Sequence, residues 1–97
     1  MQYNGWTNWQ TWLFNLYYNE DPRIIDIIED IYDEDERLED MITDIGKGME
    51  EAFLYDMPDS TGMWRDFMID AYKYVGFTEL AEGYLTDYIE SLEVEEE

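Results

Sequence analysis

The sequence carries a dense run of carboxylates in one short stretch of the chain. Ten acidic side chains fall between residues 26 and 44, where Arg37 is the only cation. They are Asp26, Glu29, Asp30, Asp33, Glu34, Asp35, Glu36, Glu39, Asp40 and Asp44. Carboxylates in such number could ligate a divalent cation, act as an acid–base pair or present negative charge to a cationic surface. Their spacing and surroundings decide among these three kinds of chemistry.

Much of this run has helical spacing, with acids three and four residues apart. If the stretch is helical at about 1.5 Å per residue, it spans on the order of 30 Å. One DNA strand carries about eight or nine phosphates over that length. Carboxylates at this spacing lie about 5–6 Å apart, which is close to the distance between neighbouring phosphates. The run therefore predicts a surface whose charge resembles that of a nucleic-acid strand.

A calcium site and a catalytic pair are poorer interpretations of these acids. An EF-hand loop needs glycine at its sixth position, but a loop begun at Asp33 has Leu38 there and one begun at Asn19 has Ile24. Paired carboxylates can serve a glycosidase, yet any two of the 26 acids can be paired on paper. No phosphate-binding loop or nucleophile motif occurs. We therefore predict no enzyme, no metal site and no cofactor.

The charge of the whole chain favours a surface directed at a partner. The 97 residues hold 26 acids and five cations, a formal net charge of −21. Solubility of a small domain needs a net charge of only about 2–8 in magnitude, and further repulsion destabilises the folded chain. A run of acids is usually just a solvated helix face, but such a face normally interleaves lysine with glutamate. Here the interleaved cations are missing.

Residue types that are absent narrow both function and location. The chain has no cysteine and no histidine, which removes disulfides, thiolate nucleophiles and the commonest general base and transition-metal ligand. Its apolar stretches are short, so we expect neither a membrane span nor a signal peptide. An acidic surface would also be repelled by anionic lipid. We expect a protein of the bacterial cytoplasm.

Apolar residues at helical spacing predict an all-α fold of four or five short helices, orthogonal or bundle-like. The predicted helices cover roughly residues 7–18, 22–33, 35–54, 61–75 and 78–92. Hydrophobic residues make up 45% of the chain and aromatic residues 18%, enough apolar surface to offset the entropy lost on folding. Residues 1–92 are predicted to form one compact domain, and residues 93–97 an acidic, frayed tail.

Local signals predict where several helices begin. Thr7 and Gln10 match a capping box, in which each side chain bonds to the backbone of the other residue. Asp21 before Pro22 predicts an N-cap followed by proline at the first helical position. Thr78 is predicted to cap the last helix.

Three glycines predict special backbone positions. Gly46 and Gly48 cost about 1 kcal/mol each inside a helix, so they indicate a bend or a tight helix crossing. Gly76 follows the fourth predicted helix, where a left-handed residue is expected.

The aromatic residues divide into a predicted core and a predicted surface. Helical spacing favours a core made from Trp6, Trp9, Trp12, Trp64, Phe67 and Tyr84. The surface members are predicted to be Tyr17, Tyr18 and Tyr55. Exposed tryptophan and tyrosine dominate interface hot spots, so these residues could form a contact patch or a dimer seam. Base stacking is a poor interpretation, since nothing in the chain would hold the phosphates.

Two segments resemble a family of small acidic proteins carried by phages, plasmids and related mobile elements. Residues Tyr3–Trp12 read YNGWTNWQTW, which resembles the family's NGWTNYETW opening. Residues Phe77–Leu85 read FTELAEGYL, which is similar to its closing helix, NWREIAExxL. The match spans nearly the whole chain, although Trp9 stands for the family's tyrosine, Gln10 for its glutamate and Phe77-Thr78 for Asn-Trp. The resemblance implies an accessory gene of a mobile element and no assigned activity.

These observations predict an acidic, DNA-mimic-type inhibitor. The composition is similar to that of phage antirestriction and anti-CRISPR proteins, so the expected target is a host defence complex, either a restriction enzyme or a CRISPR effector. The partner would be a basic nucleic-acid-binding protein or complex, with no direct contact to nucleic acid or membrane. The ten carboxylates would bind it.

Two other functions stay open at this stage. One is an adaptor that binds a basic host or phage protein through an aromatic patch with an acidic rim. The other is a chaperone-like or buffering protein without a single partner. The sequence also leaves open whether the protein is a monomer or a homodimer. A homodimer would have a longer acidic surface.

Overall fold

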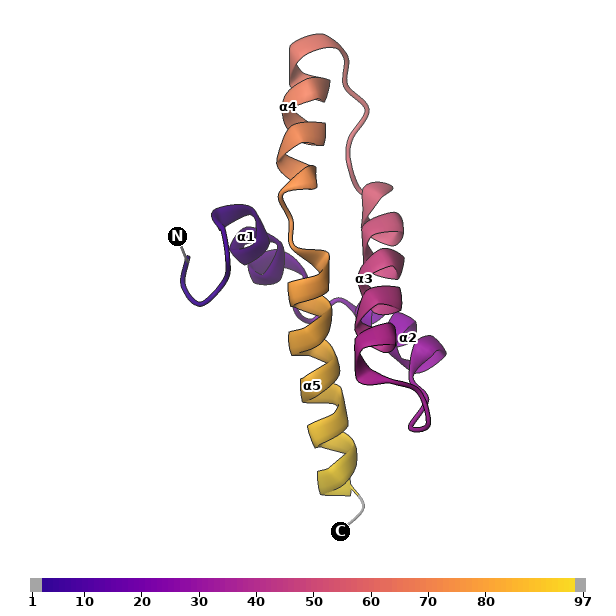
Figure 1. Cartoon of the computed structure of the whole chain (residues 1–97). Helices are drawn as coiled ribbons and strands as arrows, with labels where there is room; N and C mark the ends of the chain where they lie inside the picture. The colour runs from indigo at the N-terminus through magenta and orange to yellow at the C-terminus, as the bar shows by residue number, and fades with distance from the viewer. Residues whose placement is uncertain (1–2, 96–97) are drawn as a thin grey trace.

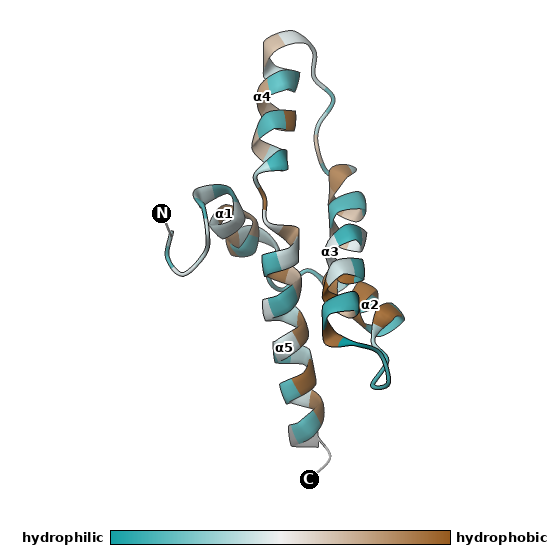
Figure 2. Ribbon diagram, in the orientation of Figure 1, coloured by the Kyte–Doolittle hydropathy of each residue, from teal (hydrophilic) through white to brown (hydrophobic). Residues whose placement is uncertain are grey.

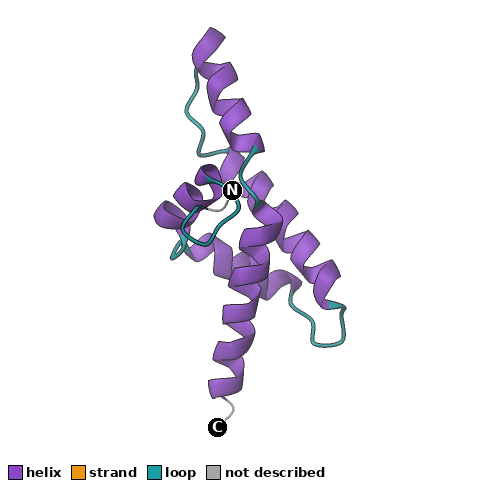
Figure 3. Ribbon diagram, turned by 60° about the vertical axis from the view of Figure 1, so that its left-hand side comes forward, coloured by secondary structure: helices purple, strands orange, loops and turns teal. Residues whose placement is uncertain are grey.

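Five helices follow one another along the part of the chain that the structure describes, residues 3–95 of a computed structural model (Figure 1). They are α1 (Trp9–Tyr18), α2 (Pro22–Ile31), α3 (Leu38–Leu54), α4 (Gly62–Lys73) and α5 (Phe77–Glu95). These residues form no strand apart from an isolated bridge between Tyr3 and Trp6 (Figure 3). The predicted all-α, single-domain fold is therefore confirmed.

The core lies where α3 packs along α5, with α2 against α3 and α1 against α5. Apolar residues recur at four-residue intervals on α3, at Met41, Ile45, Met49 and Phe53, and all four are buried. This spacing places them on one helix face. Brown and teal residues alternate around α5 in the same amphipathic way (Figure 2). Among the described residues, the apolar side chains with no exposed surface are Ile28, Ile45, Met49, Leu80, Ala81 and Leu85.

Gly46 allows the backbones of α3 and α5 to approach closely. A Cβ atom added at Gly46 would lie 3.3 Å from both the carbonyl carbon and the carbonyl oxygen of Phe77. At Gly48 an added Cβ would lie 3.1 Å from Cγ2 of Ile27 on α2. The predicted tight helix crossing is therefore confirmed, and it explains why two residues with poor helix propensity lie inside α3.

The start of α1 differs from the prediction. Asn8 is its N-cap, and Asn8 Oδ1 accepts hydrogen bonds from the backbone N–H of Thr11 at 2.9 Å and from its hydroxyl at 2.7 Å. The backbone N–H of Thr7 instead donates to the Glu79 carboxylate, 3.1 Å from Oε2. The predicted capping box of Thr7 and Gln10 is wrong because asparagine caps at least as well as threonine and Thr7 bonds to α5.

The starts of the next two helices lie close to the predicted positions. Asp21 caps α2 by accepting a hydrogen bond from the backbone N–H of Arg23 at 2.9 Å, and Pro22 is the first helical residue. This prediction is confirmed. α3 begins at Leu38, about three residues later than predicted, after a connection that includes Asp33–Arg37.

The junction between α4 and α5 also differs from the prediction. α5 begins at Phe77, so Thr78 lies within its first turn and does not cap it. Gly76 is not left-handed, since its φ lies outside the positive range. Its N–H donates to Oγ1 of Thr11 at 2.8 Å, and an added Cβ would lie 3.2 Å from the same oxygen. A residue with a side chain would crowd the Thr11 hydroxyl at this position, which explains why it is a glycine.

The far end of α5 reaches further than the predicted domain boundary at residue 92. The helix continues through Glu95, so residues 93–95 of the predicted tail are helical. Residues 96–97 lie outside the described part of the chain.

α4 projects from one end of a molecule that measures 53 × 28 × 22 Å (Figures 1 and 3). None of its side chains is buried, and Trp64 is 65% and Phe67 59% exposed. Trp9 is also exposed. The core prediction is wrong for these three aromatic residues, whereas Trp6, Trp12 and Tyr84 are half-buried. The surface prediction holds for Tyr17 and Tyr55, while Tyr18 is half-buried.

Alanine at two helical glycines tests the crossing of α3 and α5. Gly83→Ala should raise the free energy of unfolding by about 0.5–1 kcal/mol, because its Cβ would meet only Trp6 at an ordinary 3.8 Å. Gly46→Ala should lower it by about 1 kcal/mol or more through overpacking, because backbone atoms of Phe77 must move. Urea unfolding measures the free energy of unfolding of both variants and of wild type. An equal gain for the two variants would contradict the close approach.

Candidate functional site

The ten predicted partner-binding carboxylates all lie exposed on the surface of α2, α3 and the connection between them. Three belong to α2, four to the connection and three to the first half of α3. The connection is the hydrophilic loop at the lower right of Figure 2, at the opposite end of the molecule from α4. In order they are Asp26, Glu29, Asp30, Asp33, Glu34, Asp35, Glu36, Glu39, Asp40 and Asp44. We call them the ten-acid surface.

The ten-acid surface is not one straight row. α2 ends at Ile31, the chain turns, and α3 packs against α2. The turn is set by Tyr32, whose backbone is extended and whose ring lies 5.4 Å from that of Tyr88, and by Asp33, whose Oδ1 accepts the backbone N–H of Asp35. The predicted continuous array of about 30 Å is therefore wrong. The acids instead surround the end of a helix pair, and helical spacing survives within each helix.

Few of these carboxylates meet a cation within the fold. Glu39 lies 3.2 Å from Arg37, but the two side chains are 83% and 76% exposed. Such a pair contributes only about 0–1 kcal/mol. Among the described residues the other nine acids form no ion pair. The surface therefore presents nearly all of its charge to solvent.

α5 adds further acids beside this surface. Glu82, Glu90 and Glu93 are exposed, and Glu90 and Glu93 lie three residues apart, at neighbouring positions of the helix surface. Asp87 lines a groove between α2 and α5. Glu79, by contrast, is half-buried and accepts the N–H of Thr7. Glu79 therefore holds the N-terminal segment on α5, and the exposed acids within residues 77–93 are Glu82, Asp87, Glu90 and Glu93.

Among the described residues, Arg23 is the cation that bonds to more than one carboxylate, and it stabilises the fold. Arg23 bonds to Asp21 at 2.9 Å and to both carboxylate oxygens of Asp56 at 3.0 and 2.9 Å. Its guanidinium also lies 4.2 Å from the centre of the Phe53 ring. These bonds hold the pKa values of Asp21 and Asp56 below their usual range, and Tyr18 lowers that of Asp56 further by donating its hydroxyl. Arg23 thus ties α2 to the end of α3.

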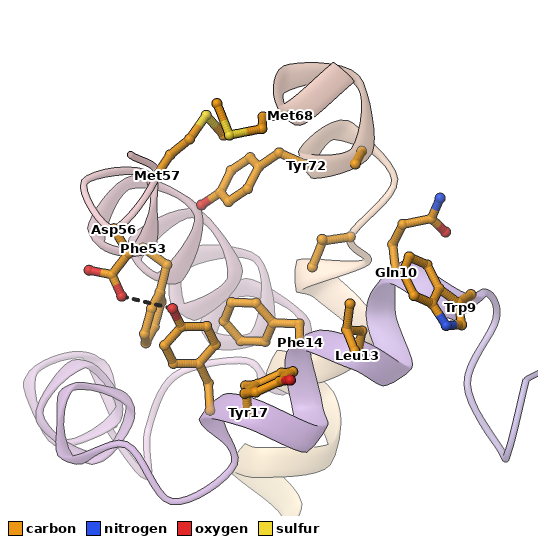
Figure 4. A pocket seen from close by; sticks show the side chains of 13 residues that line it. Trp9, Gln10, Leu13, Phe14, Tyr17, Phe53, Asp56, Met57, Met68 and Tyr72 are labelled. Atoms are coloured by element: carbon orange, nitrogen blue, oxygen red, sulfur yellow. Dashed lines mark hydrogen bonds between the residues drawn. The ribbon is translucent and has the colours of Figure 1, made fainter. Parts of the chain in front are cut away.

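A groove of about 310 Å³ lies on the other side of this contact, between α1, the end of α3 and α4 (Figure 4). Its walls are almost wholly apolar, with Leu13 and Phe14 from α1 facing Met68 and Tyr72 from α4. Burial raises the pKa of Tyr72 to about 12. The remaining lining residues are Trp9, Gln10, Tyr17, Tyr18, Phe53, Asp56, Met57, Ala71 and Val75.

The sequence signal for this groove was present but was assigned to the core. Trp64, Met68, Ala71 and Val75 recur at helical spacing, which reveals an apolar helix face. Periodicity does not show whether another segment of the same chain covers that face. In the structure Met68, Ala71 and Val75 line a groove with residues of α1, whereas Trp64 is 65% exposed.

Charge and exposed apolar surface are segregated along the molecule. Residues 57–77, which include α4, hold three acids and two cations, whereas residues 23–46 hold ten acids and two cations. Within residues 3–95 no carboxylate lies within ion-pair distance of Lys47, Arg65 or Lys73. One end can therefore attract a cationic surface and the other can bury apolar side chains.

The described residues show neither a metal-ligand cluster nor a membrane span. No three acidic side chains in this part of the chain converge on a point where they could hold a metal ion. None of the described helices combines the length and the apolar character needed to cross a bilayer.

Comparison with known proteins places the chain in a family. A family model described as "Family of unknown function (DUF7249)" matches residues 1–84. The chain belongs to this family. The matched DUF7249 region contains all ten carboxylates of the ten-acid surface, the whole of α4 and residues 77–84 of α5. No curated protein and no solved structure matches the chain.

Two arginine substitutions test the structural role of Arg23. Arg23→Gln should lower the melting temperature at neutral pH, whereas Arg37→Gln should change it little, because the Arg37 pair is exposed. Both variants gain the same unit of negative charge. Thermal unfolding followed by circular dichroism measures the difference.

The effect of Arg23→Gln should also depend on pH. The folded pKa values of Asp21 and Asp56 are depressed, so their pairing stabilises the fold above the unfolded value of about 4 and is lost as pH falls through the folded values. The difference from wild type should therefore shrink below about pH 4. Part of the difference in melting temperature should persist at low pH, because the contact of Arg23 with the Phe53 ring does not depend on the protonation of Asp21 and Asp56. A difference that grew in acid would contradict the assignment.

Proposed function

We propose that this protein is a non-catalytic inhibitor that docks its ten-acid surface on the nucleic-acid-binding site of a basic protein. The observation that carries the proposal is the gathering of ten exposed carboxylates at one end of the molecule, nine of them without an ion pair among the described residues. The repulsion among them destabilises the fold. A cationic partner would relieve it.

The shape of the acidic end suits a groove better than a flat surface. α2, the connection and the start of α3 bring acids around the end of a helix pair, and the molecule is 28 × 22 Å across its long axis. That cross-section is comparable with the width of a nucleic-acid duplex, so the end can enter a cleft that admits one. Acids three or four residues apart within each helix would face lysine and arginine side chains placed to bind phosphates.

The mechanism would be competitive and electrostatic. Long-range attraction speeds the encounter of the two proteins, and occupation of the site excludes the nucleic acid without any turnover. Within this class we propose a host defence complex, a restriction enzyme or a CRISPR effector, as the target. The resemblance to mobile-element proteins and the composition support this choice, since an incoming element gains from blocking such a complex.

The adaptor hypothesis has one observation in its favour, the exposure of Trp64 and Phe67. It requires an acidic rim around the aromatic side chains. The ten-acid surface lies instead at the other end of the molecule, and residues 57–77 hold only three acids against two cations, Arg65 and Lys73, which form no ion pair among the described residues. A basic partner would meet little net negative charge there, so we place the proposed partner on the ten-acid surface.

Charge reversal in two places tests the proposal. The first variant changes Asp26, Glu29, Asp30 and Glu36 to lysine, and the matched control changes Glu51, Asp59, Asp66 and Asp70. All eight side chains are exposed, and the net charge shifts equally. Each immobilised protein is incubated with bacterial lysate, and the captured proteins are challenged with short double-stranded DNA. Wild type and control should retain a nucleic-acid-binding protein that the DNA displaces, and the first variant should lose it.

Salt provides the second measurement. Affinity for the captured protein should weaken by roughly tenfold or more between low and physiological ionic strength, because steering by exposed charges is screened. Capture that DNA cannot displace would exclude nucleic-acid mimicry. Equal loss in both charge-reversed variants would show that only net charge matters, and not the ten-acid surface.

A further inference from the structure

The apolar face of α4 is half covered. Trp64, Met68 and Ala71 lie on one side of α4, as their spacing requires, and Val75 follows two residues after the end of the helix. Met68, Ala71 and Val75 line the groove that α1 closes, but Trp64 lies beyond the reach of α1 and stays 65% exposed. Its ring centre lies 6.0 Å from that of Phe67. An aromatic pair held on a projecting helix therefore lacks a partner element within the described residues.

The exposed apolar area on this side is large enough for an interface. Trp9, Tyr17, Trp64 and Phe67 are 47%, 75%, 65% and 59% exposed. A buried aromatic side chain covers about 150–250 Å², so these four expose on the order of 500 Å² together, and Leu13 and Met68 add to it. Two such faces would bury about 1,000 Å², which is what a specific protein–protein interface needs.

The charge around α4 is compatible with a second copy. Residues 57–77 hold three acids and two cations, so this end is nearly neutral although the whole chain has a formal net charge of −21. Two copies can therefore bring these faces together without bringing their acid-rich ends together. We infer that a second copy of this chain packs on the α4 face, formed by Trp9, Leu13, Tyr17, Trp64, Phe67 and Met68.

An antiparallel pair of α4 helices would cover both the exposed Trp64 and the groove near Met68 and Tyr72. α4 is 12 residues long, or about 18 Å, so reversing one helix against the other places Trp64 of each copy over the groove near Met68 and Tyr72 of its neighbour. This arrangement has two-fold symmetry, in which both copies use the same patch. Met68 then lies near the symmetry axis, and the two ten-acid surfaces lie at the far ends of the pair.

Sedimentation velocity across a range of protein and salt concentrations tests the dimer. Salt screens the repulsion between the copies and strengthens apolar burial, so dimerisation should strengthen with added salt. The test variant is Trp64→Ser with Phe67→Ser, and the control is Leu38→Ser, which changes a 49%-exposed leucine at the acidic end. The test variant should stay monomeric and folded by circular dichroism, since α4 buries no side chain. The control should dimerise like wild type.

A cross-linking measurement fixes the geometry without relying on the loss of an interaction. The chain has no cysteine, so a single introduced thiol is unique. A short bismaleimide should join two copies of Met68→Cys near the axis and should not cross-link Leu38→Cys, whose thiols lie far apart in the dimer. A wild-type chain that stays monomeric at high salt and millimolar protein concentration would overturn the inference. The α4 face would then be a binding surface for a different protein. A dimer that survives the double serine substitution would also overturn the inference.

The outcome is separable from that of the proposed function. The double serine variant should still bind through its acids, and the variant with four lysines on the ten-acid surface should still dimerise. The two associations should also respond to salt in opposite directions. Loss of one without the other identifies which of the two surfaces was assigned wrongly.

Discussion

The packing of α3 on α5 holds together a chain whose charges oppose folding. Ile45 and Met49 on α3 and Leu80 and Leu85 on α5 are wholly buried, and each such side chain contributes about 1.5–3 kcal/mol. Gly46 lets the two backbones meet at the start of α5. With 26 acids and five cations, the fold cannot rely on ion pairs. Stability comes from this apolar contact, and carboxylates are tolerated because they lie outside it.

A small polar network fixes where α4 goes. Asn8 donates from Nδ2 to the carbonyl of Tyr74 at 2.7 Å, and Thr11, which is fully buried, accepts the N–H of Gly76 at 2.8 Å. Leaving a buried donor without its acceptor costs about 1–3 kcal/mol. These bonds attach α1 to the junction of α4 and α5. α4 therefore extends beyond the end of α3 (Figure 1), and its N-terminal half, which includes Trp64, lies away from the core.

Much of this fold could be predicted from the sequence, and the failures have physical causes. Helical periodicity identified five segments, and Asp21 with Pro22 marked a helix start because that pairing acts locally. The break after Ile31 was hidden because the acids keep helical spacing through it, while the cause of the break, the packing of Tyr32 on Tyr88, is a long-range contact. Thr7 failed as a cap for the same reason, since its N–H bonds to Glu79, 72 residues away.

The exposure of Trp64 and Phe67 could not be predicted, because an apolar face looks the same whether its cover comes from its own chain or another. The ten acids were easier to place, since charged side chains without cationic neighbours in sequence rarely find burial elsewhere. What sequence could not supply was their arrangement around a helix end. That arrangement decides whether they match a groove or a straight row of phosphates.

Segregation of charge lets one small chain keep both kinds of surface. Two copies with a formal charge of −21 each would repel strongly if their acids met. The molecule is 53 Å long, however, and electrostatic interactions are screened over about 8 Å at physiological ionic strength. The acids at the α2–α3 end therefore have little electrostatic effect at the outer half of α4, where cations and acids almost balance. An apolar contact there costs little electrostatic energy, and the ten-acid surface remains free at the other end.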